Sequence, residues 1–335
     1  MLTLDNSLFK NVTKSLDSFY PLVNLVNSRD VLLAQDLKPY FSDGIIDDIL
    51  DLQHIYLESG KVRSCGNPSF VHSLRCLIWA KALGCDHLCS KVSLYHDYVE
   101  DFGKSFSTYS SLMKTVPEEI TTQINFLTNK YRVLINSLDF SSGLSGIAKQ
   151  LSDISSNPIL EVSASHLLSS LSDITGDVKD FFLLRSYEFY LQDLVSYVDS
   201  TKDESVILAK FFDRLDNTLT ELPGKFDTIV KLYDKNTLLL KTSKDYVFSS
   251  KNPLLKLLYI LLYVRSMDQA TALRHRYAHI ASVRGDFYGR QYLKLCHALD
   301  LEGHKLASYF KVANKLFEDP IVIDFIEKEF DLIIS

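Results

Sequence analysis

Hydrophobic residues recur along most of this chain at intervals of three and four positions, and the residues that interrupt helices are scarce. Only 12 glycines and 8 prolines occur among 335 residues. The strict alternation of apolar and polar residues that marks half-buried strands is rare. The spacing therefore predicts a mainly α protein in which each helix buries one face. A chain of this length can bury a large core, so we expect one large domain, or one domain with a helical extension.

Turn and cap residues divide the chain into the expected helices. These are two or three within residues 1–60, then 69–83, 86–101, one beginning at Pro117, 180–197 and 204–219. A polar loop separates the first group from the helix that begins at Ser69, and Gly84 is the residue expected to end that helix. The sequence features that carry chemistry are confined to residues 63–220.

Two segments differ from the rest of the chain. Residues 135–178 are rich in serine and small side chains, which predicts a partly flexible insertion over about 132–180 with a short helix near Leu167. The segment 225–335 has helical spacing and no glycine-rich phosphate loop, so we expect a helical C-terminal extension. The expected division is thus residues 1–224 and residues 225–335.

Charge and composition argue against several classes of protein. The net charge of −6 and the isoelectric point near 5.9 provide no global positive field for nucleic acid. An anionic nucleotide is still compatible, because a metal and a few cations can dominate a small pocket. Five scattered cysteines favour reduced thiols and a cytoplasmic location. The longest apolar stretch, 254–264, contains Lys256 and is too short to span a membrane.

The stretch from Tyr95 to Asp101 holds the densest group of ionisable side chains. If it is helical, His96 lies over Glu100 and Asp97 lies over Asp101, each one turn away. A solvated helix face usually mixes in lysines, and this one has none. The pattern suits a metal held by an imidazole and a carboxylate, with two further carboxylates close to whatever the metal binds.

A second polar stripe falls on the helix expected at 204–219. Lys210, Asp213, Arg214 and Asn217 recur at helical spacing on an otherwise apolar segment. Asp213 can complete a metal's ligand shell and Asn217 can hydrogen-bond a substrate. Taken alone, the stripe is more typical of a solvated face with an Asp–Arg pair, and a lone His72 is more typical of a structural histidine. Their occurrence in one chain favours a site.

The combined pieces supply two imidazoles and two carboxylates: His72, His96, Asp97 and Asp213. A mixed set of this kind suits Mn²⁺, Zn²⁺ or Fe²⁺ better than Ca²⁺, which prefers oxygen. A metal there would lower the pKa of a bound water and neutralise charge on phosphorus. Glu100 and Asp101 are the candidates to move protons.

This His…His-Asp…Asp order resembles the HD-domain metal-dependent phosphohydrolases. Tyr-His-Asp-Tyr-Val-Glu-Asp at 95–101 is similar to Leu-His-Asp-Val-Val-Glu-Asp of the hydrolase domain in RelA/SpoT-type proteins. Phe-Phe-Asp-Arg-Leu-Asp-Asn at 211–217 is similar to that family's Leu-Ala-Asp-Arg-Leu-His-Asn. The loop at 63–72 resembles its Arg-Lys-Ser-Gly-Glu-Pro-Tyr-Ile-x-His. The resemblance extends over about residues 60–222.

The resemblance implies an HD-domain helical bundle, a stand-alone alarmone hydrolase of the stringent response. Such enzymes remove the 3′-pyrophosphate of (p)ppGpp, giving GDP or GTP and pyrophosphate, normally with Mn²⁺. The implied metal ligands are His72, His96, Asp97 and Asp213. The implied catalytic carboxylates are Glu100 and Asp101. The resemblance also places Arg63 against the purine, and Asn217 and Thr220 near the ribose and its phosphates.

Several positions depart from the family pattern. Ser64 replaces its lysine, Ser69 its tyrosine and Asp216 its histidine. These changes concern the substrate more than the reaction. Three functions therefore stay open: a (p)ppGpp hydrolase, a related nucleotide phosphohydrolase such as an NADPH 2′-phosphatase, and a nucleotide sensor without turnover. We expect a small nucleotide as the partner and neither nucleic acid nor a membrane. A homo-oligomer is compatible with the sequence.

Overall fold

The computed structural model describes most of the chain up to Ser266. The described residues are 15, 18–26, 31–63, 68–103, 105–157, 160–174, 176–220, 226–263 and 265–266, with the side chains of 184, 219–220 and 226–231 excluded. Within these ranges the backbone is largely helical, and the β structure amounts to one isolated bridge between Val62 and Pro68. The mainly α fold expected from the hydrophobic spacing is confirmed.

The named helices follow one another with short connections. They are α2 (Ala34–Leu37), α3 (Asp43–Ser59), α4 (Ser69–Ala82), α5 (His87–Tyr95), α6 (Tyr98–Phe102), α7 (Phe106–Met113), η1 (Glu118–Ile120), α8 (Thr121–Leu127), α9 (Lys130–Ser137), η2 (Phe140–Ser142), α10 (Gly143–Ile154), α11 (Glu161–Ser169), η3 (Ser170–Asp173), α12 (Val178–Thr201), α13 (Ser205–Thr220) and α14 (Phe226–Ser249). Residues 18–26 and 253–263 are also helical.

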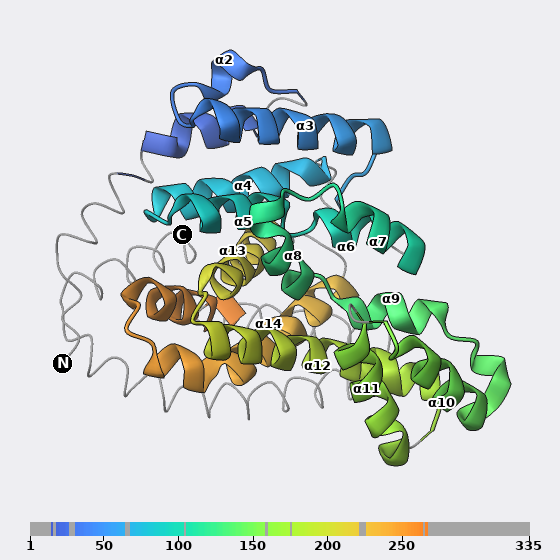
Figure 1. Ribbon diagram of the computed structural model, residues 1–335. Helices are drawn as coiled ribbons and strands as arrows, with labels where there is room; N and C mark the ends of the chain where they lie inside the picture. Colours follow the sequence, from blue (N-terminus) through green and yellow to red (C-terminus); the bar gives the residue numbers. More distant parts are fainter. Residues whose placement is uncertain are drawn as a thin grey trace, which may run out of the picture.

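Three helices, α4, α5 and α13, pack against one another at the centre of the bundle, and α3 covers α4 (Figure 1). Helix α4 is apolar around most of its circumference and is accordingly buried on nearly all sides. Helix α13 buries Phe211 and Phe212 completely. The surfaces of α4 and α13 that contact each other are buried. The polar residues on those surfaces therefore lie inside the protein.

The helix expected over 86–101 is instead two helices, with a turn at His96 and Asp97 between α5 and α6. The amide of Asp101 still donates to the carbonyl oxygen of Asp97 at 2.7 Å, so these two keep the expected spacing. The expectation of one continuous helix over 86–101 is wrong. Adjacent residues in a straight helix point about 100° apart, and the turn lets His96 and Asp97 face one point.

Two other helix starts and ends can be compared with expectation. Helix α4 begins at Ser69 as predicted, and Gly84 follows it with a φ of 76°, the left-handed conformation that favours glycine. The segment after Pro117 begins with the 3₁₀ turn η1 before α8 follows. Proline at the start of a helical segment lacks only an amide that would be unbonded there anyway.

The serine-rich segment forms α10, α11 and η3, which lie to one side of the bundle (Figure 1). The short helix predicted near Leu167 is α11, and Leu167 is fully buried. At the other end, α14 packs against α12 and α13. Of the expected extension 225–335, residues 267–335 lie outside the described residues.

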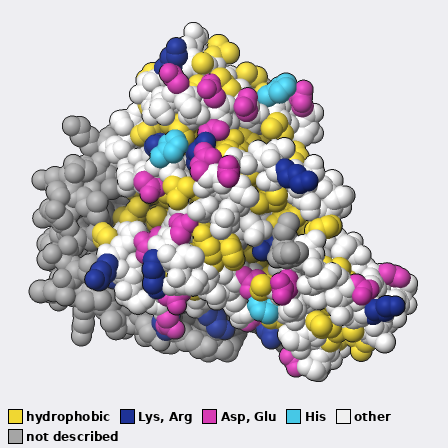
Figure 2. Space-filling model, in the orientation of Figure 1, with side chains coloured by type: hydrophobic (Ala, Val, Ile, Leu, Met, Phe, Trp, Pro, Cys, Tyr) yellow, Lys and Arg dark blue, Asp and Glu magenta, His cyan; other side chains and the backbone are white. Residues whose placement is uncertain are grey.

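The surface carries charges of both signs. Figure 2 shows acidic and basic side chains scattered among hydrophobic and uncharged ones, without a broad basic patch on the described part of the face in view. Among the described residues, no helix combines the length and apolar character needed to cross a membrane.

Candidate metal centre

Four side chains from the central helices bring their ligand atoms to one point. They are His72 on α4, His96 and Asp97 in the turn between α5 and α6, and Asp213 on α13. One nitrogen or oxygen of each lies within 4.8 Å of the others. These are the four residues that the sequence predicts as metal ligands.

Four distances within this group match those between ligands of one ion, while His96 Nε2 lies farther, 3.9 Å, from Asp213 Oδ1. The Nε2 atom of His72 lies 3.1 Å from His96 Nε2 and 3.3 Å from Asp213 Oδ1. The Oδ2 atom of Asp97 lies 3.4 Å from His72 Nε2 and 3.3 Å from His96 Nε2. Ligands about 2.1 Å from a metal and 90–110° apart are separated by about 3.0–3.4 Å. The described residues could therefore hold one divalent ion through two nitrogens and two oxygens.

Both imidazoles are oriented by a bond at their other nitrogen. The Nδ1 atom of His96 lies 2.8 Å from the carbonyl oxygen of Ser93, and that of His72 lies 2.6 Å from Asp216 Oδ2. An N–H at Nδ1 leaves the lone pair on Nε2, the atom that faces the group of four. Both histidines are buried, with only 1–2% of their surface exposed.

The polar stripe on α13 is buried, so its interpretation as a solvated face is wrong. The Nζ atom of Lys210 lies 2.8 Å from Asp213 Oδ2, Arg214 Nη2 lies 3.2 Å from Asp213 Oδ1, and Asn217 donates to Asp213 Oδ1. Burial alone would raise the pKa of Asp213, but Arg214 and Lys210 hold that pKa well below its usual range. Asp213 is therefore an ionised carboxylate.

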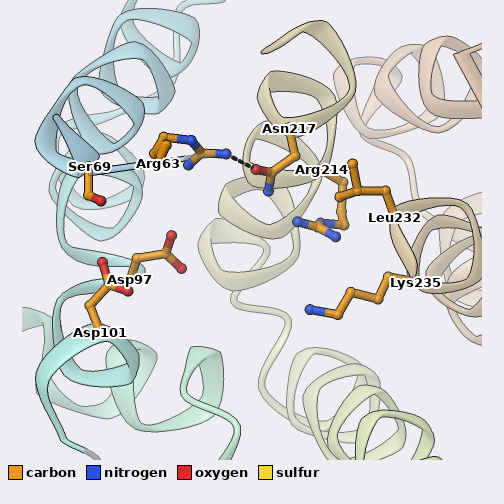
Figure 3. A pocket seen from close by; sticks show the side chains of 8 residues that line it. All are labelled: Arg63, Ser69, Asp97, Asp101, Arg214, Asn217, Leu232 and Lys235. Carbon is orange, nitrogen blue, oxygen red and sulfur yellow. Dashed lines mark hydrogen bonds between the residues drawn. The ribbon is translucent and has the colours of Figure 1, made fainter. Parts of the chain in front are cut away.

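A cavity of about 260 Å³ adjoins the group of four. It is lined by Arg63, Ser69, Asp97, Asp101, Arg214, Asn217, Leu232 and Lys235. Figure 3 shows Asp97 and Asp101 on one side, with Arg214 and Lys235 facing them from the other. Arg63 donates a hydrogen bond across the cavity to Asn217 Oδ1. The structure thus brings the predicted substrate residues Arg63 and Asn217 to the same cavity.

Two cations, Arg214 and Lys235, lie on the far wall of the cavity. Arg214 Nη1 is buried and donates to no atom of the described residues. The Nζ atom of Lys235 lies 5.2 Å from the ring centre of Tyr187. Burial, and then the positive charge of Arg214, lower the pKa of Lys235 to about 8. A buried donor without a partner is costly, so an anion in the cavity would be stabilised there.

The two proposed proton carriers occupy different positions. Asp101 lines the cavity, accepts from the Tyr56 hydroxyl at 3.0 Å and forms an ion pair with Lys61. Burial, and then the negative charge of Asp97, raise the pKa of Asp101. Glu100 is not among the residues that line the cavity, although its charge favours the protonated form of Lys235.

Sequence reasoning missed several residues at this site. Lys61 pairs with Asp101, and Leu232 and Lys235 line the cavity, although all three lie outside the range 63–220 in which the sequence features were found. Lys235 comes from α14, and no local pattern relates it to residues on α4 or α13. The side chain of Thr220 and residues 64–67 lie outside the described residues.

Comparisons with known proteins do not classify this chain. No family model, curated protein or solved structure matches it. Fold and site together define a mainly α protein with a buried His/Asp group that could hold a metal ion, beside a cavity lined by both carboxylates and cations.

Proposed function

We propose that this chain is a metal-dependent phosphohydrolase of the HD type that removes the 3′-pyrophosphate of (p)ppGpp. The observation that carries the proposal is the juxtaposition of a two-histidine, two-carboxylate group with a cavity whose opposite wall is cationic. A divalent ion suits the first wall and the phosphates of a nucleotide suit the second. Neither wall alone would favour phosphate ester hydrolysis over other functions.

The residues that would hold the ion are His72, His96, Asp97 and Asp213. They fit a divalent ion because their ligand atoms converge and their histidines present Nε2. A bound Mn²⁺, Zn²⁺ or Fe²⁺ would supply a Lewis acid for the phosphoryl group and lower the pKa of a water molecule. This donor set restricts the native ion to these divalent metals and does not select one of them.

The cations of the cavity would bind the negative charges of the substrate. Arg214 offers a buried N–H that has no partner among the described residues, and Lys235 offers an ammonium group at the cavity wall. Arg63 is the third cation, and its planar guanidinium can also stack on a purine. The hydrogen bond from Arg63 to Asn217 holds both side chains in place at the cavity.

Asp101 is the better placed of the two proposed proton carriers. Its carboxylate faces the cavity, and Tyr56 and Lys61 fix its orientation. A carboxylate with a raised pKa can exchange protons nearer neutral pH than an ordinary one. Glu100 acts on the same region through its charge on Lys235.

A nucleotide panel combined with a metal series tests the proposal. The purified chain is incubated with Mn²⁺, Zn²⁺ or anaerobic Fe²⁺, and released phosphate, pyrophosphate and triphosphate are resolved separately. We expect pyrophosphate from ppGpp and pppGpp. Phosphate from NADPH, or another product from another nucleotide, would support the related phosphohydrolase instead. Tight nucleotide binding with no product under any metal would support a sensor.

A further inference from the structure

A second polar cluster lies directly behind the proposed metal centre. Asp216 on α13 stands where the family that this chain resembles has histidine, and it contacts both His72 and Arg75 on α4. We propose that Asp216, held by Arg75, is a positioning residue that fixes the His72 ring and thereby sets how tightly the centre binds a divalent ion. The inference rests on the proposed metal centre.

The contacts within the cluster are short and directional. Asp216 Oδ2 lies 2.6 Å from His72 Nδ1. Arg75 donates from Nε to Asp216 Oδ1 at 2.6 Å and from Nη2 to Asp216 Oδ2 at 2.8 Å. Two parallel bonds from a planar guanidinium define the plane of the carboxylate as well as its position. The imidazole of His72 is therefore aligned by a group that cannot itself rotate freely.

Burial makes the contacts of this cluster hard to replace. His72 and Asp216 are each 1% exposed and Arg75 is 7% exposed, so water cannot replace a lost partner. A buried carboxylate is tolerated when ionic and hydrogen-bonding partners surround it, as here. Arg75 follows His72 by three residues on α4, which puts both side chains on the face that packs against α13.

The cluster determines which nitrogen of His72 is available. A carboxylate paired with arginine is an acceptor only, so the proton of the neutral imidazole lies on Nδ1. The lone pair is then on Nε2, which lies 3.3 Å from Asp213 Oδ1 and 3.1 Å from His96 Nε2. A carboxylate acceptor also makes an imidazole a more basic ligand. The Nδ1 atom of His96 instead faces a neutral acceptor, the carbonyl oxygen of Ser93.

Aspartate at position 216, where the family that this chain resembles has histidine, suits the contacts of this cluster. Histidine at position 216 could pair with arginine only as an acceptor and would offer a single nitrogen at a time. Aspartate offers two oxygens, one of which also accepts from His72 while both accept from Arg75. Asp216 therefore suits both of its partners, His72 and Arg75.

The test measures metal binding directly, without an activity assay. Calorimetric dissociation constants for Mn²⁺ and Zn²⁺ are compared between the full-length wild type, D216N, R75K and the control D193N. Asn has one acceptor oxygen, so its amide N–H₂ would oppose either His72 or Arg75. We expect D216N to weaken binding of both ions by about 10–100-fold. R75K keeps the positive charge but loses the two parallel N–H donors. We therefore expect R75K to weaken metal binding less than D216N does.

The control has a similar setting away from the centre. Asp193 on α12 accepts from the Tyr131 hydroxyl at 2.7 Å and lies 3.3 Å from His166 Nδ1. D193N should leave both dissociation constants unchanged while altering the melting temperature. Nitrogen-15 NMR of the wild type without metal, at a pH where His72 is neutral, gives a second readout, in which His72 should carry its proton on Nδ1.

The outcomes separate this inference from the proposed function. Wild-type affinity in folded D216N would overturn the positioning role and leave the metal centre intact. If D216N does not fold, folded R75K with wild-type affinity would overturn it equally. If the wild type binds neither ion, the proposed metal centre is wrong, and the positioning role of Asp216 is wrong with it.

Discussion

Arg63 donates a hydrogen bond to Asn217, whose own amide donates to Asp213. This chain of contacts runs from the polar loop before α4 to a proposed metal ligand on α13. It links the wall of the cavity that would bind the nucleotide to the group that would bind the ion. Arg63 and Asn217 should therefore act as a unit when substrate binds.

A double-mutant cycle tests that coupling. R63A and N217A should each raise KM, and the double mutant should be less impaired than the sum of the two. We expect a coupling free energy of about 1–2 kcal/mol in kcat/KM. K202A, which removes a cation with 69% of its side chain exposed, is the matched control and should leave KM and kcat/KM unchanged. Strictly additive effects would contradict the coupling.

Removing different members of the proposed metal centre should have different effects on stability. Asp213 is paired with buried Lys210 and Arg214, so D213A leaves two unpaired cations inside the protein. We expect D213A to lose about 3–5 kcal/mol of unfolding free energy. Asp97, whose side chain is 27% exposed, instead lies 3.3–3.4 Å from the imidazoles of His72 and His96. D97A should lose metal binding and little stability.

Urea unfolding with metal chelated checks this contrast. D97A and D213A are compared without metal, so that loss of the ion does not enter the difference. Calorimetry with Mn²⁺ then measures the metal affinity of whichever variants are folded. Equal destabilisation of the two variants would show that the pairing of Lys210 and Arg214 with Asp213 contributes little.

The pKa of Lys235 predicts how nucleotide binding depends on pH. Because this pKa is lowered to about 8, the amine is charged below pH 8 and loses its proton above it. KM for an anionic nucleotide should therefore rise as the pH passes through about 8. In K235R the charge persists and this rise should disappear. K235M should have the high KM at every pH, and a wild-type profile in K235M would exclude a binding role for Lys235.

The two neighbouring carboxylates should differ in their importance for turnover. Asp101 lines the cavity and Glu100 does not, so D101N should lower kcat about 100-fold or more. E100Q should lower it less, because its effect passes through the charge on Lys235. Metal dissociation constants should be unchanged in both variants. The opposite order of the two kcat values would identify Glu100 as the main proton carrier.

Local patterns in the sequence were sufficient for most of the helices and for the identity of the four convergent residues. Helical spacing and cap residues are short-range properties, so α4, α12 and α13 were expected close to their observed ranges. His96 and Asp97 stood out as part of a dense ionisable group, whereas His72 and Asp213 were expected as ligands because they occur in one chain with that group and because of the family resemblance. Their chemistry required no knowledge of which helices touch.

Only the tertiary structure decided what surrounds those four residues. Helix α5 ends at Tyr95 and α6 begins at Tyr98, so His96 and Asp97 lie in the turn between them, where their ligand atoms meet those of His72 on α4 and Asp213 on α13. Asp216 meets His72 across 144 positions of sequence, and Lys235 reaches the cavity from α14. Such contacts depend on how helices pack, and a helix carries no local signal of the residue that will face it. Sequence alone thus determined the helices and the candidate ligands, while packing decided their orientation, their burial and the cations opposite them.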